Sequence, residues 1–260
     1  MADENEGIAR PTPRSAFGTL SAILATCARY WRANRRIAAR HGSHRATNRT
    51  RLAAIYGTMT AEDFEALNGP QDRLNAFAIP RALSDHPDPR PWRIVDLGCG
   101  TGASSALLLR HAPPGSSLVG YDLCENLLAC ARARAWRDRR GRPLAAMFVC
   151  GAADEPLRRP QGALVAPGSI DVAHAAGLVG HHFEVAAARR LAAELDRILA
   201  TDGIAVLDAG PRLGAGELAS VMAEAGFERI GRHRLWPFAS RMALTFGRRV
   251  TRPALAAVRG

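Results

Sequence analysis

The residues of this chain whose types and spacing point most clearly to chemistry lie between positions 96 and 102. An acid, Asp96, is followed by a loop in which every second residue is a glycine. The loop residues are Gly98, Cys99, Gly100, Thr101 and Gly102. Glycine allows a sharp turn and lets a ligand approach the backbone closely. The apolar run at 93–97 predicts a buried parallel strand before this loop, and residues 103–111 predict a helix after it. A strand, a glycine loop and a helix in this order are typical of a nucleotide-type binding fold.

The glycines alone do not identify the ligand. The spacing Gly98-x-Gly100-x-x-Ala103 also fits the looser form of the dinucleotide fingerprint. Asp96 favours a different ligand, because a carboxylate one residue before the loop would repel a pyrophosphate and would suit an ammonium group.

The pattern Asp-x-Gly-x-Gly-x-Gly, formed here by Asp96, Gly98, Gly100 and Gly102, resembles the first motif of class I S-adenosylmethionine-dependent methyltransferases of the small-molecule type. The resemblance covers about residues 92–247. It implies S-adenosylmethionine as cofactor and in-line transfer of its methyl group to a small-molecule acceptor. Asp96 is then expected to order the loop or to meet the cofactor's ammonium group, while Cys99 and Thr101 offer backbone contacts.

Further cofactor contacts are expected after the second and third predicted strands. Asp122 ends the strand at 118–122, where an acid accepts hydrogen bonds from ribose hydroxyls, and Leu123 is expected to pack on the adenine. The methyltransferase family often has Gly-Asp-Ala after its third strand, whereas this chain has Gly151-Ala152-Ala153-Asp154. Two alternatives stay open: Asp154 replaces the missing acid from a shifted loop, or the backbone at Ala152 and Ala153 serves alone.

Candidates for proton transfer follow the fourth predicted strand, at 170–174. His181 and His182 would stand near the strand ends, where a histidine could take a proton from an acceptor hydroxyl; the alternative is that they cap or pack at the next helix. Asp208 and Arg212, beyond the fifth strand, could line the acceptor pocket. The Asn/Asp-Pro-Pro-aromatic motif of amino-directed nucleic-acid methyltransferases is absent, and no metal site is expected.

The elements that position these residues alternate from Trp92 onward, which predicts an α/β fold. We expect a Rossmann-like, doubly wound and mostly parallel seven-stranded sheet. The last two predicted strands, 227–232 and 241–246, are joined by a short connection, which implies an antiparallel edge strand. The predicted crossover helices lie at about 103–111, 124–139, 184–200 and 216–225.

An N-terminal helical cap is expected before the sheet. The predicted organisation is a disordered tail at 1–15, a helical cap or lid at 16–90, a methyltransferase domain at 91–250 and a tail at 251–260. Within the cap, Asn68-Gly69-Pro70 is expected to separate two short helices. The cap aromatics are expected either to form a lid over the acceptor or to form the cap's own core: Tyr30, Trp31, Tyr56 and Phe64.

The charge of the chain has two readings. The formal net charge is +11, and the 35 basic residues are all arginine, which indicates either a codon bias or a basic binding surface. Between Glu6 and Glu62 there are ten arginines and no acid. The predicted helix at 17–40 is amphipathic, so it either makes peripheral contact with a membrane surface or packs its apolar face on the domain behind it.

Three alternatives to a small-molecule methyltransferase remain. An RNA methyltransferase is supported only by the arginines, so nucleic acid is a disfavoured partner. A non-catalytic S-adenosylmethionine-binding module is compatible with the missing acid at Ala152. A nicotinamide-dependent oxidoreductase is disfavoured by Asp96 and by the late strand pair. The five scattered cysteines have no paired framework, which favours reduced thiols and a cytoplasmic location.

Overall fold

The computed structural model describes residues 13–44, 46–84, 86, 88–138, 140–144, 146–235 and 242–249, with side chains from residue 20 onward. Most of the first expected tail and all of the second lie outside these residues. Helix α1 begins at Pro13, so residues 13–15 are helical and the expected tail to residue 15 is too long.

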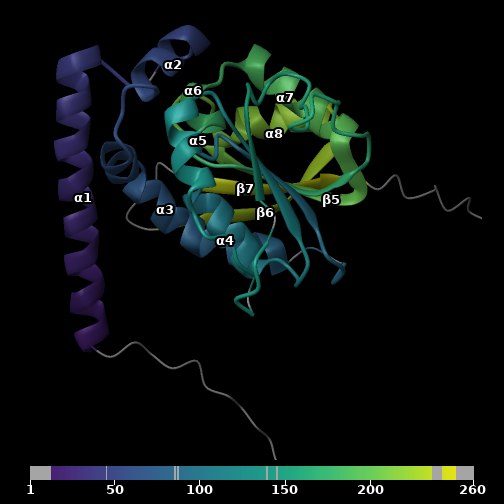
Figure 1. Ribbon diagram of the computed structural model, residues 1–260, viewed down its shortest axis with the longest axis horizontal. Helices are drawn as coiled ribbons and strands as arrows, with labels where there is room; N and C mark the ends of the chain where they lie inside the picture. The colour runs from purple at the N-terminus through teal and green to yellow at the C-terminus, as the bar shows by residue number, and fades with distance from the viewer. Residues whose placement is uncertain are drawn as a thin grey trace, which may run out of the picture.

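A seven-stranded sheet with the order β3-β2-β1-β4-β5-β7-β6 forms the body of the molecule (Figure 1). Its strands are β1 Arg93–Leu97, β2 Ser117–Asp122, β3 Ala146–Cys150, β4 Ile170–Ala175, β5 Leu199–Ala209, β6 Phe227–Arg234 and β7 Met242–Arg248. The strands β1 to β5 pair in parallel, and β7 is antiparallel to both β5 and β6. The predicted fold class is therefore confirmed, with the antiparallel strand lying one position in from the edge.

Helices cover both faces of the sheet. They are α4 Ala103–His111, α5 Glu125–Arg132, α6 Val179–His182, α7 Val185–Ile198 and α8 Ala215–Glu224. Alternation along β1 directs Val95 and Leu97 toward α6, α7 and α8, while Ile94 packs with α4, α5 and the second half of α3. The predicted helix at 124–139 is too long, since α5 ends at Arg132. Asp138 lies in a turn, where its carboxylate accepts hydrogen bonds from the backbone N–H groups of Arg140 and Arg142.

Three helices precede the sheet: α1 Pro13–His41, α2 Arg49–Tyr56 and α3 Ala61–Ser84. The expected break at Asn68-Gly69-Pro70 is wrong, since α3 continues through Pro70 and Pro80. Packing offsets the backbone hydrogen bond that a proline removes. A Cβ on Gly69 would lie 3.0 Å from Thr26 Cγ2, so this glycine allows α1 to approach α3 closely.

The second half of α3 belongs to the core of the sheet rather than to a separate cap. Leu74, Ile79 and Leu83 are buried in one cluster with Ile94 of β1 and Leu108 of α4. The boundary proposed at residue 90 is thus a boundary in the sequence and not in the packing of side chains.

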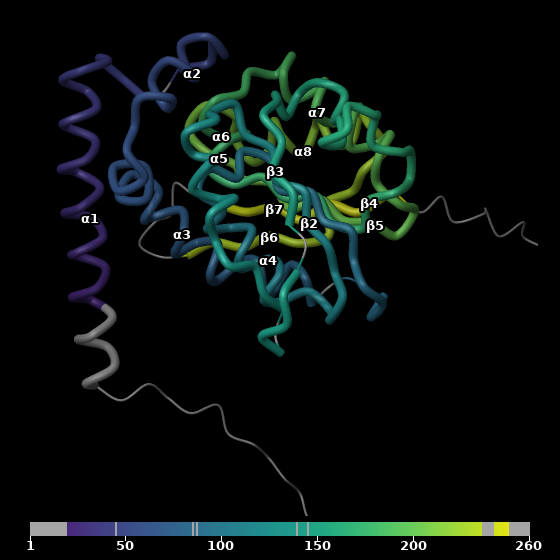
Figure 2. Tube along the Cα trace, in the orientation of Figure 1, coloured from purple at the N-terminus to yellow at the C-terminus, as the bar shows by residue number. Residues whose placement is uncertain are grey.

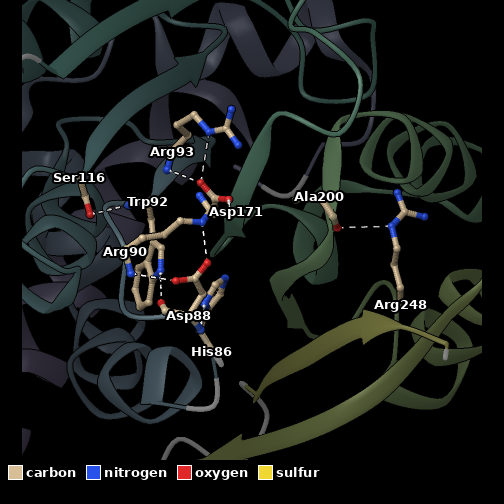
Figure 3. A network of polar contacts seen from close by, with 9 residues as sticks. All are labelled: His86, Asp88, Arg90, Trp92, Arg93, Ser116, Asp171, Ala200 and Arg248. Atoms are coloured by element: carbon tan, nitrogen blue, oxygen red, sulfur yellow. Dashed lines mark hydrogen bonds and ion pairs between the residues drawn. The ribbon is translucent and has the colours of Figure 1, made fainter.

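The linker between α3 and β1 is held at the amino ends of the strands by a buried carboxylate (Figure 3). Asp171 of β4 accepts hydrogen bonds from the Arg90 guanidinium at 2.8 Å and from the Arg93 backbone N–H at 2.7 Å. Beside it, Trp92 donates from its backbone N–H to Ser116 Oγ and from its indole to the Asp88 carbonyl, both at 2.8 Å. These contacts lie at the end of β1 opposite to the glycine loop, so they fix the strand on which the loop is built.

Candidate active site

The loop after β1 has the backbone conformation that its glycines predict. Gly98, Gly100 and Gly102 have φ angles of 69°, 53° and 82°, a region that side chains with a Cβ rarely adopt. The backbone N–H groups of Gly98 and Cys99 both donate to the Tyr121 carbonyl, at 2.8 and 3.0 Å. The loop is therefore attached to the end of β2 as it turns into α4.

Asp122 joins the end of β2 to this loop. Its carboxylate accepts hydrogen bonds from the backbone N–H groups of Gly100 and Cys124, each at 2.9 Å. Burial raises the pKa of the Asp122 carboxyl above its ordinary value, although both hydrogen bonds act in the opposite direction. Burial also raises the pKa of the neighbouring Cys124 thiol to about 12, so that this cysteine stays a neutral thiol at neutral pH.

Asp96 lies on the opposite side of the loop, beneath α4. One carboxylate oxygen accepts hydrogen bonds from Ser104 Oγ at 2.8 Å and Ser105 Oγ at 2.5 Å, and the other is 2.7 Å from His174 Nδ1. Asp96, Ser105 and His174 are almost completely buried. These contacts fix the start of α4 against β1 and β4, and α4 is the helix that directly follows the glycine loop. Asp96 does not line the cavity described next, so its contact with a cofactor ammonium group stays a prediction.

A cavity of about 480 Å³ opens at the carboxyl ends of the parallel strands, where an α/β sheet usually binds its ligand. The sheet domain contributes Gly98, Asp122, Leu123, Cys124, Leu127, Gly151, Ala152, Ala153, Asp154, Ala176, Gly177, Leu178, His182, Phe183, Glu184, Ala186, Ala187 and Arg190. The preceding helices contribute Thr47, Asn48, Arg49, Leu52, Tyr56, Phe64 and Asn68. The cavity is therefore enclosed between the sheet and the α2–α3 segment.

The cavity brings together part of the predicted cofactor site. Its lining includes Gly98, Asp122, Leu123, Ala152, Ala153 and Asp154 of the predicted residues. The rest of the loop is covered by other side chains: a Cβ on Gly100 would lie 2.2 Å from Cζ of Phe64, and one on Gly102 would lie 2.8 Å from the Trp136 ring. Thr101 is buried and donates to Glu65, and Cys99 is also buried.

Asp154 is bound to arginines that the sequence analysis did not single out. Its two oxygens lie 2.7 Å from Arg49 Nη2 at the start of α2 and 2.6 Å from Arg190 Nη2 of α7. Burial acts to raise the pKa of the Asp154 carboxyl, but the two guanidinium groups outweigh it and hold this pKa below its ordinary value. Asp154 thus connects α2 to the sheet domain across the cavity. A role of Asp154 as the adenine contact stays a prediction.

His182 reaches the cavity, whereas His181 is not among its lining residues. The Nδ1 atom of His182 is 3.0 Å from the Ala46 carbonyl oxygen, and its Nε2 atom is 3.3 Å from the Tyr56 hydroxyl. A carbonyl oxygen can only accept, so we assign the proton to Nδ1 and leave Nε2 as an acceptor from Tyr56.

Asp208 and Arg212 are also not among the residues that line this cavity, so their place in an acceptor pocket stays a prediction. The Asp208 carboxylate instead accepts hydrogen bonds from the backbone N–H groups of Leu178, Val179 and Gly180 and so fixes the start of α6. The donors of a helix N-terminus need such a partner when they are buried.

The four cap aromatics separate into two pairs. Tyr56 and Phe64 line the cavity, with ring centroids 6.1 Å apart. Tyr30 packs beside the small cluster of α1, α2 and α3 that contains Ile37 and Leu67, and Trp31 is 61% exposed. Among the described residues, no group of three or more histidines, cysteines or acids is placed to hold a metal ion.

Comparison with known proteins agrees with this geometry. Residues 94–203 match the family model of a methyltransferase domain. A trans-aconitate 2-methyltransferase from Acidovorax sp. (strain JS42) is 55% identical over 53 residues, which cover 20% of this chain and 19% of that protein. The chain thus matches about a fifth of the length of this curated relative.

Two solved structures show the same fold. The magnesium protoporphyrin IX methyltransferase of Synechocystis PCC 6803 with bound SAM has a TM-score of 0.60 at 13% identity, with 77% of this chain and 97% of that chain covered. A SAM-dependent methyltransferase from Leishmania major has a TM-score of 0.60 at 11% identity, with 76% and 82% covered.

Proposed function

We propose that this protein binds S-adenosylmethionine in the cavity and transfers the methyl group to a small-molecule acceptor by in-line displacement. The observation that carries the proposal is the glycine loop bound by Asp122 at one wall of the cavity. This loop lies within the residues that match the family model of a methyltransferase domain. The reduced state of all five cysteines is in line with the cytoplasmic location that we also propose.

The chemistry of the lining residues suits this cofactor. Asp122 would accept hydrogen bonds from the ribose hydroxyls, and Leu123, Ala152 and Ala153 would pack against the adenine. The cavity also contains the carboxylates of Asp154 and Glu184. Arg49 and Arg190 line the same wall and pair with Asp154, so the charge of the cavity alone does not distinguish the proposed cofactor from a dinucleotide.

The protein's part in the reaction would be to position the reactants and to exclude water. When bound, the cofactor supplies a sulfonium methyl that is already activated for displacement. Tyr56 and Phe64 enclose the cavity from the α2–α3 side. The volume of about 480 Å³ falls in the range of small-ligand sites, roughly 300–1,000 Å³. Enclosure by aromatic side chains therefore favours a small acceptor over a macromolecule.

His182 is the proposed general base for an acceptor that loses a proton. Its Nε2 atom faces the Tyr56 hydroxyl at 3.3 Å, and both residues line the cavity. The hydrogen bond to Ala46 holds the ring in the tautomer in which Nε2 can accept a proton.

Calorimetric titration with S-adenosylhomocysteine and with NADH tests the proposal. We expect the wild-type protein to bind S-adenosylhomocysteine and not NADH. Asp122→Ala should weaken that binding by roughly tenfold or more, because a hydrogen bond to a charged acceptor is worth about 1.5–3 kcal/mol. Glu228→Ala is the matched control, since Glu228 is an exposed acid on β6 that does not line the cavity, and its affinity should be unchanged.

The other outcomes separate the alternatives. Binding of NADH without S-adenosylhomocysteine would overturn the proposal. Binding without methyl transfer to any component of a metabolite extract, followed with labelled cofactor, would indicate a non-catalytic binding module. Binding of RNA with a steep salt dependence, together with RNA methylation, would favour the RNA methyltransferase.

A further inference from the structure

Helix α1 has two separate apolar faces. The first packs on α2 and α3 and includes Ala33 and Ile37, which are buried. The second consists of Leu20, Leu24 and Trp31, which are 49%, 61% and 61% exposed. Packing on the domain therefore accounts for only part of the amphipathic pattern of this helix.

The exposed apolar residues form one strip along the helix. At 100° per residue, positions 20, 24 and 31 fall within about 40° of one another, and this strip points roughly 120° away from the centre of the buried face. These are three of the six large apolar side chains that are exposed among the described residues. We call Leu20, Leu24 and Trp31 the α1 strip.

Two exposed arginines follow the α1 strip on one side of the helix. Arg35 lies about 40° and Arg32 about 100° from the centre of the strip. Arg29 and Arg40 lie on the far side of α1, and Arg29 and Arg32 line a groove with the acids Glu62, Glu65 and Asp72 of α3. Arg36 pairs with Asp63 of α3. No acidic residue occurs anywhere between positions 7 and 61.

The molecule presents this surface at its outer side. Figure 1 shows α1 along one edge of the molecule, with α3 between it and the sheet. Figure 2 shows the same separation of the described part of α1 from the sheet. A flat surface could therefore approach α1 without meeting the sheet domain first.

We propose that the α1 strip, with Arg32 and Arg35 on one side of it, docks the protein on the surface of an anionic lipid bilayer. The apolar side chains would enter the boundary between headgroups and acyl chains, and the guanidinium groups would bind the anionic headgroups. Tryptophan is well suited to that boundary because its ring is both apolar and a hydrogen-bond donor.

A second copy of the chain fits the same surface less well. Pairing two α1 helices through the strip would bring their arginines together, and the helix has no acid to compensate that repulsion. A lipid surface instead supplies negative charge to Arg32 and Arg35, which lie on the side of the strip. No described helix is long and apolar enough to cross a bilayer, so the contact that we propose is peripheral.

Vesicle flotation of the full chain tests this docking independently of any methyl transfer. The probes are phosphatidylcholine vesicles with and without phosphatidylglycerol, at low and high salt. We expect binding to the anionic vesicles at low salt to exceed binding to neutral vesicles by about tenfold or more, since each surface arginine contributes to the attraction. High salt should weaken it.

Two sets of substitutions identify the surface. Leu20→Gln, Leu24→Gln and Trp31→Gln together should reduce vesicle binding by about tenfold or more, because three apolar anchors are lost. Arg32→Gln and Arg35→Gln together should lower the preference for anionic vesicles by roughly tenfold or more. The control is Met147→Gln, Leu164→Gln and Ile230→Gln, which removes three other exposed apolar side chains, 39–48% exposed, and should bind like the wild type.

Each remaining outcome contradicts the proposal. Absence of binding to anionic vesicles overturns it, as does equal loss in the control triple variant. A dimer in sedimentation velocity that dissociates in the α1-strip variant, without vesicle binding by the wild type, assigns the surface to a second copy instead. All variants change exposed side chains, and a thermal melt by circular dichroism verifies that each is folded.

Discussion

His181, the neighbour of His182 in the sequence, provides a control variant for the proposed general base. His182 faces Tyr56 in the cavity, whereas His181 is not among the lining residues. If His182 accepts a proton from the acceptor, His182→Gln should lower kcat by about 10²–10⁴-fold, which is the usual contribution of a general base. His181→Gln should leave kcat nearly unchanged.

The measurement is steady-state methyl transfer with the acceptor identified by labelling, together with calorimetry of S-adenosylhomocysteine. Affinity for that ligand should be retained in both variants, because neither histidine belongs to the proposed cofactor contacts. An equal loss of kcat in the two variants would show that substitution in this segment disturbs the local structure in general. An unchanged kcat in His182→Gln would rule out His182 as the general base.

Single residues differ in how far the sequence predicts them. The conformation of Gly98, Gly100 and Gly102 follows from their type and spacing, because few other residues accept such φ angles. The partners of Asp154 could not be predicted in this way, since they lie on α2 and α7, far away in the sequence. His174 shows the same limit. Its bond to Asp96 depends on the pairing of β1 with β4, which no local pattern contains.

At the scale of elements, α2 is held over the cavity by a few polar contacts. Arg49 pairs with Asp154, the His182 ring bonds the Ala46 carbonyl, and the Asn126 amide donates to the Tyr56 and Met59 carbonyls. We expect Arg49→Gln to increase amide hydrogen exchange in residues 46–56 by up to about fivefold, because partly exposed ion pairs contribute up to about 1 kcal/mol.

Exchange followed by mass spectrometry, with and without S-adenosylhomocysteine, checks this expectation. Arg189→Gln is the matched control, since Arg189 lies next to Arg190 on α7 but pairs with the exposed Glu224 instead. It should leave exchange in residues 46–56 unchanged. Equal exchange in wild type and Arg49→Gln would mean that the ion pair does not hold α2.

Elements were predictable where a local pattern determines them. The alternation from Trp92 onward predicts the strands and crossover helices because the apolar period changes with each element. The break expected before Pro70 failed because burial of α3 between α1 and the sheet outweighs the local cost of proline. The position of β7 between β5 and β6 is set by pairing over long distances, so the sequence indicated only an antiparallel pair.

For the molecule as a whole, the Asp171 network should couple stability to pH. Burial acts to raise the pKa of the Asp171 carboxyl, but hydrogen bonds from Arg93 and Arg90 outweigh it and hold this pKa below its ordinary value. A carboxyl whose pKa is lower in the folded state stabilises the fold above its unfolded pKa, about 3.9 for aspartate. That contribution disappears as the pH falls through the lower, folded value.

Asp171→Asn should therefore lower the free energy of unfolding at neutral pH by roughly 1.5–3 kcal/mol, the value of hydrogen bonds to a charged group. The difference from the wild type should shrink below about pH 4. Urea unfolding at a series of pH values measures both effects. Glu224→Gln, in an exposed ion pair, should show little change at any pH. A difference independent of pH would mean that Asp171 acts through packing alone.

The course of α3 determines how a ligand can enter and leave. Its first turn places Phe64 against Gly100, while its second half buries Leu74, Ile79 and Leu83 beneath the sheet. Moving α3 away would expose these side chains, at about 1.5–3 kcal/mol each. Detaching α2 breaks its polar contacts with the sheet domain and exposes two buried apolar side chains, Leu52 and Ile55, of the smaller cluster. The second half of α3 is therefore the more firmly held wall of the entrance, and the rate of ligand exchange should follow the opening of α2.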